Sequence, residues 1–147
     1  MINVHFGKRK IVGLNVGFGI IEQQRPVRIG IVGSRRRDSS KDKEKVVVAL
    51  DQYLETHNIG NYILVSGGCP DGADRFAKDI AIERGLTILI HYPDWETHGK
   101  VGGIIRNTKI ANDCDVLIAC VATDRKGGTE NTIRKVKKLN KPIILVK

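Results

Sequence analysis

One glycine-rich stretch has the residue types and the spacing for binding chemistry. Residues 66–74 are Ser-Gly-Gly-Cys-Pro-Asp-Gly-Ala-Asp, between an apolar run at 62–65 and a helical pattern at 75–84. A strand that ends in glycines and continues into a helix leaves free backbone N–H groups at the positive end of the helix dipole, where a phosphate binds well. A tight turn without a ligand fits the same residues. The candidate ligand-binding residues here are Ser66, Gly67, Gly68, Gly72, Ala73 and Asp74.

A second glycine pair, Gly127 and Gly128, precedes Thr129 at the start of another helical pattern. Thr129 can either cap this helix or donate its hydroxyl to a phosphate oxygen. Neither loop has the GxxxxGK spacing of a nucleoside triphosphatase or the GxGxxG spacing of a dinucleotide-binding turn. The sequence therefore predicts two phosphate-binding loops and disfavours ATP hydrolysis and hydride transfer.

Arginines near these loops are candidates for contact with the phosphate. Arg35 follows Gly33 and Ser34 after an apolar run, and Arg106 precedes Asn107 in a helical pattern. A guanidinium group can donate two parallel hydrogen bonds to a phosphate. We expect Arg35 and Arg106 to act in this way.

Three other residue types near the loops suggest further roles. Asp74 could bind a ribose hydroxyl or stabilise the dipole of its own helix. Trp95, in a loop expected at 93–100, could stack against a base. We expect Arg36 and Arg37, by contrast, to point outward into solvent.

The apolar pattern predicts the elements that position these residues. Five short apolar runs, at 27–32, 62–65, 86–90, 116–121 and 143–146, alternate with helical patterns at about 40–57, 71–84, 102–113 and 129–140. Strict alternation of this kind indicates a Rossmann-like, doubly wound α/β fold: a parallel sheet of about five strands with helices on both faces. The unusual loops all follow strands, so they share the carboxyl edge of the sheet, where ligands bind in such folds.

The first 25 residues have a different pattern. Apolar residues alternate from Ile2 to Ile20, with a break at Gly7–Lys10, which predicts a β-hairpin followed by a linker at 23–26. The expected domains are a hairpin extension at 1–25 and a nucleotide-binding domain at 26–147. The apolar face of the hairpin would either form a homodimer or extend the sheet.

Composition limits the class of protein. The 147 residues are 41% hydrophobic and 28% charged, as in a single folded domain. No apolar run is long enough to span a membrane, and the N-terminus has no signal-peptide pattern, so a cytoplasmic protein is expected. Of the three cysteines, Cys114 and Cys120 are expected in the core, and none has the spacing of a metal site. The net charge of +9 fits either an anionic partner or a lysine-rich surface.

These motifs, in this order, resemble the YspA-related branch of the SLOG superfamily over about residues 28–147. The resemblance rests on Gly33-Ser34-Arg35, Ser66-Gly67-Gly68, Gly72-Ala73-Asp74, Pro93-Asp94-Trp95, His98-Gly99-Lys100, Arg106-Asn107 and Gly128-Thr129. This superfamily has a Rossmann-like fold and includes cytokinin-activating phosphoribohydrolases and the DNA-processing protein A group. The resemblance implies binding of a nucleotide or a nucleotide-derived ligand.

In the phosphoribohydrolases, an arginine before the fourth strand and a glutamate in a PGGxGTxxE motif cleave an N-glycosidic bond. Arg106 matches the arginine, but Thr132 occupies the glutamate position and Glu130 lies two residues earlier. If the chain is such a hydrolase, Glu130 or Asp74 must supply the carboxylate.

Three functions are therefore open. The first is binding of a phosphorylated nucleotide-like ligand, as a sensor or a nucleotide-processing enzyme. The second is hydrolysis of nucleoside 5′-monophosphates, with Arg106, Glu130 and Asp74 as catalytic candidates. The third is sequence-independent binding of nucleic acid, which the basic charge suggests.

Overall fold

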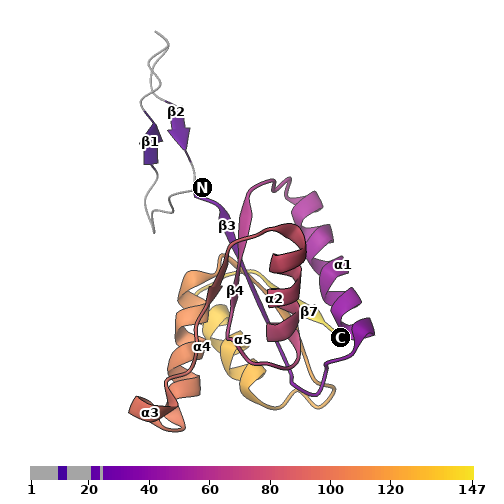
Figure 1. Cartoon of the computed structure of the whole chain (residues 1–147), viewed down its shortest axis with the longest axis vertical. Coiled ribbons are helices and arrows are strands. Elements are labelled where there is room, and N and C mark those ends of the chain that lie inside the picture. The colour runs from indigo at the N-terminus through magenta and orange to yellow at the C-terminus, as the bar shows by residue number, and fades with distance from the viewer. Residues whose placement is uncertain (1–9, 13–20, 24) are drawn as a thin grey trace.

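The computed structural model describes residues 10–12, 21–23 and 25–147. A parallel sheet with helices on both faces forms the body of the molecule (Figure 1). Its strands are β3 (Val27–Gly33), β4 (Tyr62–Ser66), β5 (Ile88–Ile90), β6 (Val116–Cys120) and β7 (Ile143–Val146). Its helices are α1 (Ser40–Thr56), α2 (Ala73–Arg84), α3 (Trp95–His98), α4 (Val101–Asp113) and α5 (Gly128–Lys138). The predicted fold class is confirmed.

The sheet has the strand order β5-β4-β3-β6-β7. The first strand of this sheet, β3, lies in its middle. The chain then adds β4 and β5 on one side of β3 and crosses to the other side to form β6 and β7. All four strand pairs in this sheet are parallel. The order reverses between β3 and β6, and the carboxyl ends of these two strands define the switch point at which such folds bind ligands.

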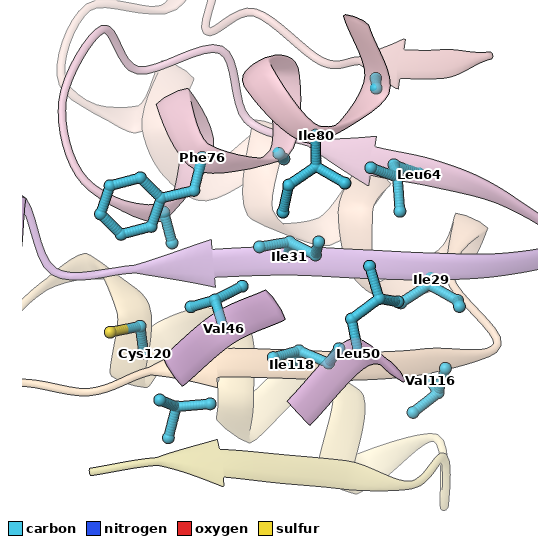
Figure 2. Close-up of a cluster of buried hydrophobic side chains, with 14 residues drawn as sticks. Ile29, Ile31, Val46, Leu50, Leu64, Phe76, Ile80, Val116, Ile118 and Cys120 are labelled. Atoms are coloured by element: carbon cyan, nitrogen blue, oxygen red, sulfur yellow. The ribbon is translucent and has the colours of Figure 1, made fainter. Parts of the chain in front are cut away.

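Two apolar layers hold the helices against the sheet. On one face, side chains of α1 and α2 pack on β3, β4 and β6, and Leu50 of α1 and Ile80 of α2 lie on either side of Ile31 (Figure 2). On the other face, Ile110 of α4 and Val136 of α5 pack on the sheet. Cys114 and Cys120 are fully buried, as expected, one on each face.

Residues that favour helix ends lie at the start of α1 and at the end of α2. Ser39 caps α1, and its hydroxyl accepts a hydrogen bond of 3.1 Å from the N–H of Asp42, whose carboxylate reaches back in a capping box. Gly85 ends α2 in the left-handed conformation, with φ of 64°, which glycine adopts without strain.

The structure corrects several details. The loop expected at 93–100 contains α3, whose N-cap Asp94 accepts a hydrogen bond of 3.0 Å from the N–H of Thr97. Leu139, within the helical pattern expected at 129–140, instead follows α5 and is 44% exposed. Arg37 points inward: its guanidinium donates to the carbonyl oxygens of Val121 and Val146 at 3.1 and 2.9 Å and pairs with Asp42.

The strands of the N-terminal segment lie at other residues than the sequence predicts. Strands β1 (Lys10–Val12) and β2 (Ile21–Gln23) pair antiparallel, with Lys10 opposite Gln23. Lys10 was expected in the turn and Gln23 in the linker, but both lie in strands, so the predicted bounds of the turn and the linker were wrong. The rest of the predicted hairpin, at 2–9 and 13–20, lies outside the described residues. Dimerisation or sheet extension by this segment stays a prediction.

Candidate functional site

The loops after β3 and β6 are joined across the switch point. The N–H of Ser34 donates to the carbonyl oxygen of Cys120 at 2.9 Å. Arg36 forms a bidentate ion pair with Asp124, at 2.9 and 2.7 Å, and also donates to the carbonyl oxygen of Lys126. Arg36 therefore lies along the loop between β6 and α5 and brings the β3 loop against it.

Gly33 allows α2 to start directly against the end of β3. A Cβ atom at this position would lie 2.7 Å from the Cβ of Ala73 and 2.8 Å from the carbonyl oxygen of Cys120. Both contacts are shorter than real Cβ contacts, and one is with backbone. The close packing of strand and helix therefore requires glycine at position 33.

The turn between β4 and α2 is built from glycines in unusual conformations. Gly68 and Gly72 have φ of 74° and 71°, in the region that favours glycine. A Cβ on Gly72 would lie 2.7 Å from the carbonyl oxygen of Ser34, so the start of α2 packs on the β3 loop. The N–H of Gly72 donates to the Asp38 carboxylate at 2.7 Å, and Arg75 donates to the same carboxylate.

Asp74 is buried at the first turn of α2. The residue is 9% exposed, and its carboxylate accepts a hydrogen bond of 3.0 Å from the N–H of Cys69. Burial raises the pKa of the Asp74 carboxyl, and this effect outweighs the hydrogen bond from Cys69 and the charge of Arg106, which both lower the pKa. A partly desolvated carboxyl with a raised pKa at a sheet edge is typical of a functional site, although structural clusters also produce one.

Arg106 lies beside this carboxyl. Its guanidinium donates to the carbonyl oxygen of Gly67, and its Nε donates to the side-chain oxygen of Asn107 at 2.9 Å. A Cβ on Gly67 would lie 2.6 Å from Nη1 of Arg106 and 2.9 Å from Oδ2 of Asp74. Gly67 therefore leaves room for the charged ends of both side chains, and Arg106 is already bound to the β4 turn.

Asn107 connects α4 to the second glycine loop. Its side-chain amide donates to the carbonyl oxygen of Gly128 at 3.4 Å and to the side-chain oxygen of Asn131 at 3.2 Å. Asn107 is only 8% exposed, so these bonds are largely shielded from bulk water. Two adjacent residues of α4 thus reach the loops that follow β4 and β6.

The start of α5 is open. Its N-cap is Gly127, with φ of 116°, and no side chain caps the helix. Gly127 and Gly128 are exposed, and a Cβ on Gly128 would meet no atom within 4 Å. Thr129 lies within the first turn and does not cap the helix, which corrects one of its two expected roles. Among the described residues, therefore, no side chain accepts a hydrogen bond from the first N–H groups of α5, and the two glycines leave this helix end uncovered.

The carboxylate of Glu130 is engaged in an ion pair. Arg125 donates to it from Nε and Nη2, at 2.9 and 3.0 Å, and adopts a left-handed backbone conformation with φ of 54°. Thr132, at the position of the phosphoribohydrolase glutamate, is 2% exposed. The structure therefore brings Arg106 and Asp74 together and binds Glu130 separately to Arg125.

The two remaining candidates are exposed. Within residues 25–147, Arg35 makes no hydrogen bond or ion pair, and it lies in the loop that Arg36 joins to the residues before α5. Trp95 is 56% exposed and packs against Gly103 of α4, where a Cβ would lie 3.2 Å from its ring.

Sequence reasoning missed two residues at this edge. Asp38 binds the N–H of Gly72, and Tyr92 packs against Gly68. A signal for Tyr92 existed, since it is an aromatic residue just after a strand at the predicted ligand edge. Asp38 had no signal, because its partner is 34 residues away in the sequence.

Within 10–12, 21–23 and 25–147, no group of three or more His, Cys, Asp and Glu side chains could hold a metal ion. No helix in the same part of the chain is long and apolar enough to cross a membrane.

Two solved structures have a similar fold. The molybdenum cofactor binding protein of the phototrophic bacterium Rippkaea orientalis is 24% identical, with a TM-score of 0.63, over 84% of this chain and 77% of that chain. The Moco carrier protein of Chlamydomonas reinhardtii is 19% identical, with a TM-score of 0.55, over 83% of this chain and 76% of that chain. At these identities the likeness extends to the fold alone.

Sequence comparison identifies the family. The Gene 61 protein of Mycobacterium phage D29 is 34% identical over 121 residues, which are 80% of this chain and 94% of that protein. The model of the YspA, cpYpsA-related SLOG family matches residues 27–98, which contain the loops after β3, β4 and β5. The family predicted from the glycine motifs is thereby confirmed, and the chain belongs to the YspA, cpYpsA-related SLOG family.

Proposed function

We propose that this protein binds a phosphorylated small molecule, a nucleotide or a nucleotide-derived compound, at the carboxyl edge of its sheet. The observation that supports this most is the start of α5, where Gly127 and Gly128 are exposed and no side chain in the described part of the chain caps the helix. Uncapped N–H groups at the positive end of a helix favour a phosphate. Arg35, exposed in the neighbouring loop, would add a charge-assisted contact.

The start of α2 supports a different part of the same site. The carboxylates of Asp38 and Asp74 already accept hydrogen bonds from the N–H groups of Gly72 and Cys69. Two negative charges at this end would repel a phosphate, whereas they can accept hydrogen bonds from hydroxyl or amino groups. We therefore assign the phosphate to α5 and the uncharged part of the ligand to the β4–α2 turn.

The fold neighbours are consistent with this class of ligand. Both are named for the molybdenum cofactor. Chemically, this cofactor is a pterin compound that carries a phosphate. Nucleoside monophosphates and phosphorylated pterins share a phosphate and a planar heterocycle. Either compound would bind with its phosphate at α5 and its heterocycle at the β4–α2 turn. The protein would act on this ligand as a sensor or as a processing enzyme.

Cleavage of an N-glycosidic bond is the second candidate. It is favoured by one observation, the buried Asp74 carboxyl next to the guanidinium of Arg106. In such a reaction a carboxylate takes a proton from water as the water oxygen attacks the sugar carbon, and the base leaves with the electrons of the broken C–N bond. Glu130 could do the same only after leaving Arg125.

Calorimetric titration tests the proposed function. We expect GMP or AMP to bind, and the corresponding nucleosides to bind about 10- to 100-fold more weakly because they lack the charge-assisted contacts. Arg35→Gln and Gly128→Val should lower affinity for the monophosphate by a similar factor. Arg134→Gln is the matched control, since Arg134 is also exposed on α5 but lies almost two turns from its start.

The outcome distinguishes this proposal from the alternatives. Equal affinity for monophosphate and nucleoside, or unchanged affinity in both site variants, would reject the phosphate assignment. Gly68→Val is unsuitable here, because a Cβ on Gly68 would clash with Tyr92. Binding of an oligonucleotide that weakens steeply with salt, without binding of monophosphates, would favour the nucleic-acid function, since each neutralised phosphate adds to the salt dependence.

A further inference from the structure

The ring of Tyr92 lies directly against the glycine turn after β4. Tyr92 is the second residue after β5, and a Cβ on Gly68 would be 2.6 Å from both Cδ1 and Cε1 of its ring. The same Cβ would be 2.8 Å from Cγ2 of Ile90. The ring therefore packs on the backbone of Gly68 with no side chain between them, which holds it at the ligand edge of the sheet.

Most of this ring is nevertheless open to solvent. Tyr92 is 64% exposed, and in the described range 25–147 no group hydrogen-bonds to its hydroxyl. Exposure alone is common for tyrosine and implies nothing. Here, however, the exposed ring is held against the turn that also contains the Gly67 carbonyl bound by Arg106 and the Cys69 N–H bound by Asp74.

The position of the turn matches the dimensions of a nucleotide. The turn follows β4, whereas the proposed phosphate position follows β6, and β3 separates the two strands. Two strand spacings are about 10 Å, which is of the order of the span from phosphate to heterocycle in a nucleoside monophosphate. A ligand with its phosphate at the start of α5 can therefore extend to the turn.

We propose that Tyr92 stacks against the planar heterocycle of the ligand, a purine or a pterin ring, and so sets the preference for phosphorylated compounds that contain such a ring. This inference rests on the proposed function, because the phosphate at α5 fixes the direction of the ligand. Trp95, the aromatic residue that the sequence suggests, packs on Gly103 and not on the β4 turn. The geometry favours Tyr92 as the stacking residue.

The test is calorimetric titration of the full chain with GMP, AMP and ribose 5-phosphate, which has no ring to stack. The unmodified protein should bind at least one nucleotide more tightly than ribose 5-phosphate. Tyr92→Leu, which keeps bulk over Gly68, should lower affinity for the nucleotide roughly 5- to 100-fold, the range for loss of one base–aromatic stack, without changing affinity for ribose 5-phosphate. Tyr92→Phe should keep nucleotide affinity, and Ile82→Ala, exposed on α2, is the control.

Each other outcome overturns a defined claim. If the unmodified protein binds none of the three probes, the proposed function fails and this inference fails with it. If it binds GMP or AMP and Tyr92→Leu binds them equally well, or if Trp95→Ala alone loses affinity, only the inference about Tyr92 is wrong. A Tyr92→Leu protein that loses affinity equally for ribose 5-phosphate and the nucleotides would show a general disturbance of the site and would also reject stacking.

Discussion

The side-chain amide of Asn107 donates a hydrogen bond of 3.4 Å to the carbonyl oxygen of Gly128, the first residue of α5. The preceding residue on α4, Arg106, donates to the carbonyl oxygen of Gly67 in the β4 turn. One helix therefore holds both glycine loops, although they are about 60 residues apart in the sequence. The relative position of the two halves of the proposed site depends on α4, so α4 should influence binding even where it does not contact the ligand.

Replacing Asn107 should affect stability and binding together. Asn107→Ala removes the bonds to Gly128 and Asn131 and leaves Nε of Arg106 without its acceptor, which should cost about 1–3 kcal/mol of unfolding free energy in urea. Affinity for GMP should fall as the start of α5 loosens. Asn112→Ala is the control, because Asn112 is exposed on the same helix. Wild-type stability and affinity in Asn107→Ala would contradict the positioning role.

Adding one methyl group at Gly33 should destabilise the fold. In Gly33→Ala the new Cβ must lie within 3 Å of Ala73 and of the Cys120 carbonyl unless the strand and α2 move apart, which should cost about 1–3 kcal/mol in urea denaturation. Gly60→Ala is the matched control, since a Cβ there meets nothing within 4 Å. That variant should be neutral or stabilised by up to about 1 kcal/mol. Equal stability of the two variants would show that β3 and α2 are not packed this closely.

The ionisation of Asp74 should make the free energy of unfolding depend on pH in a defined direction. Because burial raises the pKa of this carboxyl above its ordinary value of 3.8, the folded state binds the proton more tightly than the unfolded state. The contribution of protonated Asp74 to stability is therefore full below 3.8 and is lost as pH rises through the folded-state pKa.

Asp74→Asn does not titrate and keeps an oxygen acceptor for the Cys69 N–H. The difference in unfolding free energy between this variant and the wild type should shift in favour of the variant as pH rises from about 3 to about 7. Urea titrations at several pH values measure it. A difference that stays constant would show that the Cys69 hydrogen bond and the Arg106 charge balance burial, and one that shifts toward the wild type would show that they outweigh it; either result would contradict this prediction.

The main body of the fold could be predicted from the sequence because its signals are local. Alternation of apolar runs and helical patterns gave the five strands of the sheet, and Ser39 and Gly85 marked ends of α1 and α2 through their own cap chemistry. The helix α3 was missed because four residues are too short for an apolar period, although Asp94 three residues before Thr97 is a capping signal. The turn and the linker at the N-terminus were predicted at the wrong residues because alternation alone does not locate a turn.

The site was less predictable because it depends on contacts between distant residues. Adjacent Arg35, Arg36 and Arg37 look alike in sequence, but Arg36 pairs with Asp124, Arg37 points inward and Arg35 remains exposed. Both helix starts lack a side-chain cap within the described residues, and they differ because a distant carboxylate, that of Asp38, accepts a hydrogen bond from the N–H of Gly72. The motif spacing predicted a phosphate-binding loop at both helix starts and could not show that the two starts differ.

Hydrolysis can be tested by incubating the protein with nucleoside monophosphates and measuring released base. If the site cleaves the glycosidic bond, Asp74→Asn should lower the rate by about 10²-fold or more with little change in affinity, because the buried carboxyl lies beside Arg106. Glu130→Gln should have a smaller effect, since Arg125 already holds that carboxylate. Release that persists in both variants would refute the assignment of the carboxylate, and no release from any monophosphate would leave ligand binding as the function.

The most direct test of the central claim is a two-dimensional ¹H–¹⁵N NMR titration of the protein with GMP. Free N–H groups at the uncapped start of α5 should receive the phosphate, so the largest amide shifts should occur at Gly128 and Thr129. Guanosine, which has no phosphate, should not change the chemical shifts of these two amides. If the largest shifts instead occur at Cys69 and Gly72, where carboxylates occupy the N–H groups, or if GMP and guanosine shift α5 equally, the phosphate does not bind where the structure leads us to place it.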